Sequence, residues 1–141
     1  MKMPCVFDRA LRNREVVSEL LSYMCEDIAA GRIPEDVTII CSGKFGILVQ
    51  ELLPAAVMVD GGLRWKETPE PVLTENPGRC VFIDDGLYTC RTYSKIRSAV
   101  DKAGGEMVGA YFGYQAGNPY RPVYMRSICT FEDVRRELDD Y

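Results

Sequence analysis

The chain has 141 residues, of which 17 are basic and 21 acidic, so its formal net charge is −4, and it contains no histidine. With 47% apolar residues it has an ordinary globular composition, and its length predicts a single domain over residues 1–141 with one core. The lack of an imidazole excludes Ser/His/Asp and Cys/His nucleophiles, His-ligated zinc and a histidine general base. The small negative charge, without a basic cluster, argues against nucleic acid as a partner.

No segment has the pattern of a secretory signal or of a membrane span. Residues 1–14 are charged and lack an apolar core, and the longest near-continuous apolar stretch, 52–59, is short and interrupted by Pro54. We therefore expect a soluble cytoplasmic protein that does not engage a membrane. The six cysteines contain no Cys-x-x-Cys pair, so we expect reduced thiols, mostly in the core.

The first predicted element is an amphipathic helix, because apolar residues recur with helical spacing before Gly31 and Pro34. These apolar residues are Val17, Leu20, Leu21, Met24 and Ile28. A short buried strand is predicted over 37–41 and an apolar helix over 47–53, with the Ser-Gly-Lys-Phe-Gly turn at 42–46 between them.

The middle of the chain predicts a strand at 57–59, and then a turn at 60–62 that leads into a hairpin carrying 63–66. Another strand is predicted over 80–83, followed by two acids and a loop over 86–92. A helix over 92–103 and a strand over 107–112 complete a βαβ unit, whose strands should be parallel.

Near the C-terminus, short strands are predicted at 123–125 and 128–129. Thr130 and Asp133 have the spacing of a capping box that opens a final helix. The alternation of strands and helices predicts an α/β fold, with a doubly wound, mostly parallel sheet and helices on both faces.

The strongest candidate for a functional segment is residues 80–92. Four apolar residues end a strand, Asp84 and Asp85 follow at its tip, and Thr89 and Thr92 lie where a loop enters a helix. Backbone amides and the positive end of a helix dipole form a cradle for an anion such as phosphate. Because two carboxylates would repel that phosphate, they should bind sugar hydroxyls or Mg²⁺ instead. These features together indicate a phosphoribosyl group.

This thirteen-residue stretch resembles the phosphoribosyl pyrophosphate signature of the type I phosphoribosyltransferases. The order of apolar residues, two acids, three residues, Thr, a small residue, any residue and Thr matches without a gap. The resemblance covers about residues 35–112 and places 37–46 at the family's pyrophosphate loop. The tail, 122–133, weakly resembles the end of orotate phosphoribosyltransferases. The implied fold is the type I phosphoribosyltransferase-like fold.

The resemblance also implies roles for individual residues. Asp84 and Asp85 would bind the ribose hydroxyls, although neighbouring strand residues face opposite ways, so one of them could brace the loop instead. Lys66 would be the basic catalytic residue of a mobile loop. The remaining substrate-binding residues would be Ser42, Gly43 and Lys44 for pyrophosphate and the segment Gly86, Leu87, Tyr88, Thr89, Cys90, Arg91 and Thr92, in which Thr89 to Thr92 would hold the 5-phosphate.

The implied activity is Mg²⁺-dependent transfer of phosphoribosyl between 5-phosphoribosyl 1-pyrophosphate and a nucleobase or similar acceptor. The Mg²⁺ would be bound mainly through substrate oxygens rather than by protein ligands, and the protein would be a homodimer. Pyrophosphate leaves through a cationic transition state, and this chemistry needs positioning and charge stabilisation rather than a histidine.

The alternative function is a non-catalytic module of the same fold that binds a phosphoribosyl ligand or nucleotide as a regulator. Compact size, the short basic loop and Cys90, where the family most often has glycine, favour the module. Lys44, Lys66 and the two acids favour the enzyme.

Other interpretations of the same residues are weaker. A haloacid-dehalogenase phosphatase needs Asp-x-Asp, but Ile83 lies two positions before Asp85. The 42–46 turn is not a Walker loop. Cys90 beside Arg91 could be a reactive thiol, although packing or accident explains it better. Five aromatic residues could either stack on a base or pack in the core or a dimer interface: Tyr111, Phe112, Tyr114, Tyr120 and Tyr124.

Overall fold

The computed structural model describes residues 9–59, 73–87, 90–119 and 123–139. Its elements, in chain order, are α1 (Arg9–Ala29), β1 (Thr38–Cys41), α2 (Gly43–Leu52), β2 (Val57–Met58), β3 (Arg79–Leu87), α3 (Arg91–Lys102), β4 (Glu106–Gln115), β5 (Tyr124–Thr130) and α4 (Phe131–Asp139).

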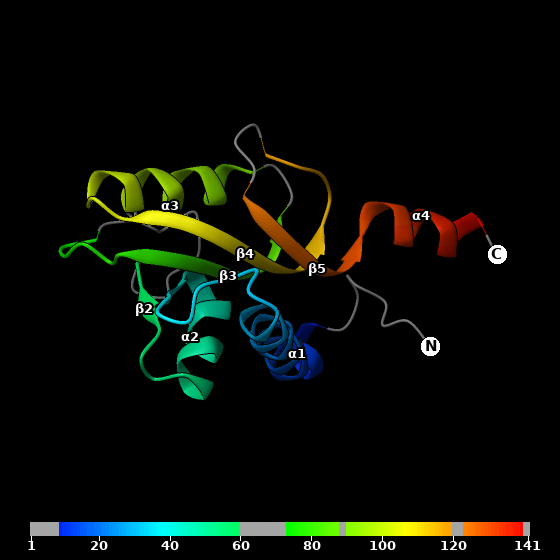
Figure 1. The fold of residues 1–141 in the computed structure, drawn as a ribbon. Coiled ribbons are helices and arrows are strands. Elements are labelled where there is room, and N and C mark those ends of the chain that lie inside the picture. The colour runs from blue at the N-terminus through cyan, green and yellow to red at the C-terminus, as the bar shows by residue number, and fades with distance from the viewer. Residues whose placement is uncertain (1–8, 60–72, 88–89, 120–122, 140–141) are drawn as a thin grey trace.

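The strands form one five-stranded sheet in the order β2-β1-β3-β4-β5, and every neighbouring pair is parallel. Helices α1 and α2 lie on one face, α3 lies on the other, and α4 extends beyond β5 (Figure 1). The structure therefore confirms the predicted parallel sheet with helices on both faces.

The core has two layers because successive residues of a buried strand face opposite sides of the sheet. Val81 and Ile83 of β3 belong to the apolar cluster that contains α1, whereas Phe82 packs in the cluster on the α3 side with Ile96 and Val100. The predicted apolar face of α1 is confirmed, and three of its residues are buried: Val17, Leu20 and Met24.

Several element boundaries differ from the sequence prediction. Helix α2 begins at Gly43 rather than at 47, so the predicted turn forms the first turn of the helix. Strand β3 continues past 83 to Leu87, and β5 is one strand rather than two. Pairing with β4 explains the longer β3, because Gly86 and Leu87 lie opposite Tyr114 and Gln115. Cross-strand pairing thus overrides the low strand propensity of the Asp-Asp-Gly sequence.

The predicted capping box at the start of α4 is confirmed. The backbone N–H of Thr130 donates to Oδ2 of Asp133 at 2.9 Å, and the N–H of Asp133 donates to Oγ1 of Thr130 at 3.3 Å. These reciprocal hydrogen bonds satisfy backbone donors at the point where β5 ends and the helix begins.

A buried carboxylate ties α1 to β4 and β5. Asp27 is 0% exposed and accepts hydrogen bonds from the hydroxyls of Tyr111 (2.7 Å) and Tyr124 (3.0 Å). Nε of Arg32 donates to it at 2.8 Å, and Nη1 of Arg126 lies 3.4 Å away. Burial alone would raise the pKa of Asp27, but the hydrogen bonds that it accepts outweigh burial and hold the pKa below its ordinary value.

The cysteines only partly match the expectation of reduced core thiols. Among the residues that the structure describes, four cysteines are free thiols, of which Cys41 and Cys80 are buried and Cys25 is exposed. Burial raises the pKa of Cys80 to about 11, so it is protonated at neutral pH. Cys129 is disulfide-bonded, which corrects the prediction of a reduced thiol there. The sequence could not show this, because no Cys-x-x-Cys spacing marks Cys129 as one of a pair.

Candidate functional site

The candidate site lies where the direction of the chain through the sheet reverses. Strands β1 and β3 are neighbours, with Thr38 opposite Cys80 and Ile40 opposite Phe82. After β1 the chain enters α2 on one face, and the helix that follows β3, α3, lies on the other face (Figure 1). Such a switch point opens a crevice at the carboxyl ends of the two strands, where ligands of open α/β sheets bind. The two segments predicted to bind the ligand thus follow neighbouring strands.

The first of these segments forms the N-terminus of α2. Ser42 is the N-cap residue, only 4% exposed, and its side chain makes no capping hydrogen bond. Gly43 has a φ of 64°, which glycine adopts without steric cost. Lys44 is exposed on the first turn. The backbone N–H groups of a first helical turn and the helix dipole favour an anion at this position.

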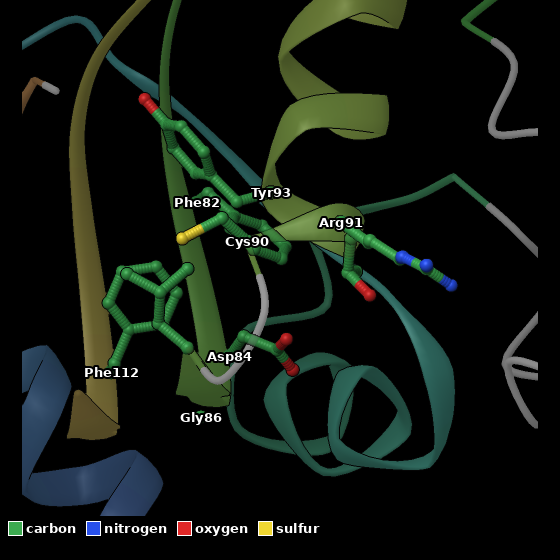
Figure 2. Close-up of a pocket in the computed structure, with 9 residues that line it drawn as sticks. Phe82, Asp84, Gly86, Cys90, Arg91, Tyr93 and Phe112 are labelled. Atoms are coloured by element: carbon green, nitrogen blue, oxygen red, sulfur yellow. The ribbon is translucent and has the colours of Figure 1, made fainter. Parts of the chain in front are cut away.

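The two acids of β3 have different surroundings. Asp84 is 8% exposed, lies opposite Phe112 of β4 and lines a small pocket at the start of α3 (Figure 2). Asp85 is half-buried and is not among the residues that line this pocket. By strand alternation its side chain projects to the face that α1 and α2 cover. The structure therefore brings one acid, not both, to the pocket.

The pocket lies between β3, β4 and the first turn of α3. Its described lining consists of Phe82, Asp84, Gly86, Leu87, Cys90, Arg91, Thr92, Tyr93 and Phe112. Its volume of about 60 Å³ holds only a few atoms, whereas pockets that enclose a small-molecule ligand measure roughly 300–1,000 Å³. A phosphoribosyl ligand would thus have most of its atoms outside this pocket, over the carboxyl edge of the sheet.

The start of α3 carries an unusual cysteine. Cys90 is the N-cap residue, with φ 65° and ψ 6°, and it is the one non-glycine residue with positive φ among those described. This left-handed conformation costs an L-residue roughly 1–2 kcal/mol. The carbonyl of Cys90 accepts a hydrogen bond from the N–H of Ser94 at 2.9 Å. Arg91 and Thr92 are exposed on the first turn, and the Arg91 guanidinium points away from the pocket (Figure 2).

Some predicted site residues belong to another element than expected, and others lie outside the described residues. Gly86 and Leu87 belong to β3 rather than to a loop, so the segment between strand and helix is shorter than predicted. Lys66, Tyr88 and Thr89 lie outside the described residues, and their roles stay predictions.

The aromatic residues of β4 and β5 pack in the core. Tyr111 and Phe112 are 0% exposed, and the hydroxyls of Tyr111 and Tyr124 bind Asp27. Tyr120 lies outside the described residues.

Sequence reasoning assigned no site role to Phe82 or Tyr93, although both line the pocket. Phe82 could have been found because it lies two positions before Asp84 on the same strand, and residues with this spacing share a face. The position of Tyr93 depends on where α3 begins, and the helix begins at Arg91 rather than at the predicted residue 92.

Among the described residues, no group of three or more His, Cys, Asp or Glu side chains could hold a metal ion. Magnesium is commonly bound by one or two carboxylates together with substrate phosphates and water. The Asp84 carboxylate at the carboxyl edge of the sheet fits a Mg²⁺ ion held in that way. In the parts of the chain that the structure describes, none of the helices combines the length and apolar character needed to span a membrane.

Comparisons with known proteins identify the fold of this chain. No family model matches the sequence, and no curated protein matches it. An orotate phosphoribosyltransferase from Aeropyrum pernix matches with a TM-score of 0.58 at 15% identity, covering 89% of this chain and 74% of that one. An adenine phosphoribosyltransferase from Rhodothermus marinus matches at 0.54 and 18%, covering 84% and 78%.

A hypoxanthine phosphoribosyltransferase from Trypanosoma cruzi matches with a TM-score of 0.50 at 11% identity, covering 85% of this chain and 77% of that one. At these identities the likeness establishes architecture. The chain has the α/β fold of the type I phosphoribosyltransferases, with its two candidate anion-binding helix N-termini following the central strands β1 and β3.

Proposed function

We propose that this chain binds 5-phosphoribosyl 1-pyrophosphate at the switch point between β1 and β3 and transfers its phosphoribosyl group to a nucleobase or a similar amine. The observation that carries the proposal is the adjacency of the two candidate segments, which follow neighbouring parallel strands. The compared structures, which are phosphoribosyltransferases for orotate, adenine and hypoxanthine, support the same class of reaction.

Each part of the ligand has a matching group in this proposal. The ribose hydroxyls donate to the carboxylate of Asp84, and the 5-phosphate lies at the N-terminus of α3, close to Thr92. Pyrophosphate lies at the N-terminus of α2, where the buried Ser42 hydroxyl and the exposed Lys44 are available as donors. The two helix dipoles then place positive potential at both phosphate positions.

The proposed reaction needs little covalent chemistry from the protein. A nitrogen of the base attacks C1 of the ribose, and the bond from C1 to the pyrophosphate oxygen breaks with its electrons going to pyrophosphate. The nitrogen then releases a proton to water. Positive charge on the ribose and negative charge on the leaving group are the features to stabilise, so oriented donors and cations suffice. Lys66 is proposed as one such cation.

Magnesium belongs to this proposal as an ion bound mainly through substrate oxygens. It would neutralise charge on the pyrophosphate as that group leaves. The carboxylate of Asp84 would hold the ribose hydroxyls in place for this contact. A homodimeric, cytoplasmic protein is also proposed, and light scattering during size-exclusion chromatography tests the dimer.

The decisive experiment measures pyrophosphate release from 5-phosphoribosyl 1-pyrophosphate with Mg²⁺ across a panel of bases that includes orotate, adenine and hypoxanthine. We expect release that depends on one of the bases. The left-handed Cys90 at the phosphate-binding turn favours the second candidate, a non-catalytic binding module. Tight ligand binding without release for any base would establish the module and reject the enzyme.

Ligand binding should raise the melting temperature of the protein. At a free ligand concentration ten times its dissociation constant, binding to the folded state adds about 1.4 kcal/mol of stability. For a chain of this length the melting temperature should then rise by about 5 °C. Differential scanning fluorimetry with 5-phosphoribosyl 1-pyrophosphate and Mg²⁺ measures the shift, with inorganic sulfate as the control anion. An equal shift with sulfate would show that the site binds anions without recognising ribose.

A further inference from the structure

Cys90 lies at the turn into α3 in a backbone conformation that cysteine rarely adopts. Its φ of 65° and ψ of 6° are left-handed, and the other positive φ values in the described parts of the chain belong to glycines. L-residues disfavour this conformation because Cβ approaches the following carbonyl oxygen. Such a residue persists only when its surroundings hold it in place.

The contacts of the Cys90 side chain show what holds it. Cys90 packs against the apolar cluster between the sheet and α3, and it lines the pocket together with Phe82 and Phe112. In Figure 2 its Sγ points toward the side where Phe112 lies, whereas the Arg91 guanidinium points the opposite way. The side chain makes no capping hydrogen bond to α3. Its contribution to this turn is therefore apolar packing.

The direction of the side chain also decides what the turn can offer a ligand. Because Sγ is directed at the core, the thiol does not cover the outer side of the first turn of α3. A helix begins with backbone N–H groups that have no partner within the helix, and these are the groups that bind phosphate. Cys90 can thus fix the turn without taking the place of the phosphate.

We propose that Cys90 is a positioning residue, whose side chain packs against the apolar cluster between the sheet and α3 and holds the first turn of α3 in the conformation that receives the ligand phosphate. The inference rests on the proposed function, because it assumes that a phosphate binds there. Glycine would adopt the same φ more easily but has no side chain to pack, so the turn would populate other conformations. A turn ordered in advance spares the cost of ordering it on binding.

The test compares Cys90→Gly and Cys90→Ala with the wild-type protein by titration calorimetry with 5-phosphoribosyl 1-pyrophosphate and Mg²⁺, under reducing conditions. We expect Cys90→Gly to raise the dissociation constant about tenfold, and Cys90→Ala, which keeps Cβ, to lie between the two. Cys25→Ala, at an exposed cysteine of α1, is the matched control and should bind as the wild type does. Tighter binding by Cys90→Gly would mean that the side chain obstructs the phosphate, and this would overturn the proposal.

A second measurement separates positioning from general stability. Hydrogen exchange of the Ser94 amide, which donates to the carbonyl of Cys90 across this turn, should without ligand be about tenfold faster in Cys90→Gly. Faster exchange or a lower melting temperature with an unchanged dissociation constant would mean a merely structural role and would overturn the positioning role alone. No binding of the ligand by the wild-type protein would overturn the proposed function, and the ligand role of Cys90 with it.

Discussion

Replacing Asp84 with Asn should weaken the binding of 5-phosphoribosyl 1-pyrophosphate about 100-fold, which is about 2.7 kcal/mol. Asp84 is 8% exposed and lines the pocket at the start of α3. An amide keeps the shape of the carboxylate but removes its charge and one of its two acceptor oxygens. Hydrogen bonds from the ribose hydroxyls to a charged acceptor are worth about 1.5–3 kcal/mol each, so their loss accounts for this magnitude.

Asp85→Asn is the matched control for this prediction, because it makes the same chemical change one residue along the same strand. Asp85 is not among the residues that line the pocket, so its replacement should change the dissociation constant less than threefold. Titration calorimetry at constant Mg²⁺ measures both variants. Equal losses would show that the two acids act together on the ribose, and an unchanged Asp84→Asn would assign Asp84 a structural role.

The sequence predicted which elements the fold contains better than it predicted where they end. The apolar face of α1, the βαβ unit of β3, α3 and β4, and the capping box of α4 are all local patterns, and each is present. The strand order was not predictable by the same means. It depends on which strands pair, and pairing is a long-range property that periodicity does not contain.

At the candidate site, too, the local sequence predicts some features, and long-range strand pairing determines the others. The positions of Asp84 and Asp85 at the carboxyl end of a strand follow from the sequence, but the burial of the first and the different face of the second do not. The sequence predicted a strand end at Ile83, whereas pairing with β4 extends the strand to Leu87. Because the strand continues through both acids, their side chains alternate between the two faces of the sheet. Pairing with β4 therefore gives the two acids different surroundings.

Asp27 is the residue whose surroundings differ most from what the sequence suggests, and it lies away from the candidate site. In the sequence it is one acid near the end of an amphipathic helix, where a charged residue is normally solvated. In the structure it is 0% exposed and accepts hydrogen bonds from side chains far along the chain, including Tyr111 and Tyr124. Three of its partners come from β4 and β5, so only the tertiary fold assembles this network.

Asp27→Asn should lower the free energy of unfolding by about 3 kcal/mol, because the amide has no charge to strengthen the buried hydrogen bonds from Tyr111 and Tyr124 and leaves one of these donors facing an N–H group. Tyr111→Phe removes one hydrogen bond to a charged group and should cost about 2 kcal/mol. Urea unfolding followed by circular dichroism measures both variants. Glu26→Gln is the control, since Glu26 neighbours Asp27 and pairs with Arg126 but is exposed, and its loss should cost less than about 1 kcal/mol.

The direction of the pKa shift of Asp27 predicts how the stability difference between the wild type and Asp27→Asn changes with pH. Hydrogen bonds from Tyr111, Arg32 and Tyr124 outweigh burial and hold the pKa of Asp27 below its ordinary value. A lowered pKa in the folded state contributes stability that is fully present above the unfolded pKa, about 3.9 for Asp, and is lost as the pH falls through the folded value. The stability difference between wild type and Asp27→Asn should therefore be constant from pH 7 to 5 and shrink below about pH 4. A difference that grows on acidification would mean that Asp27 is protonated in the folded protein.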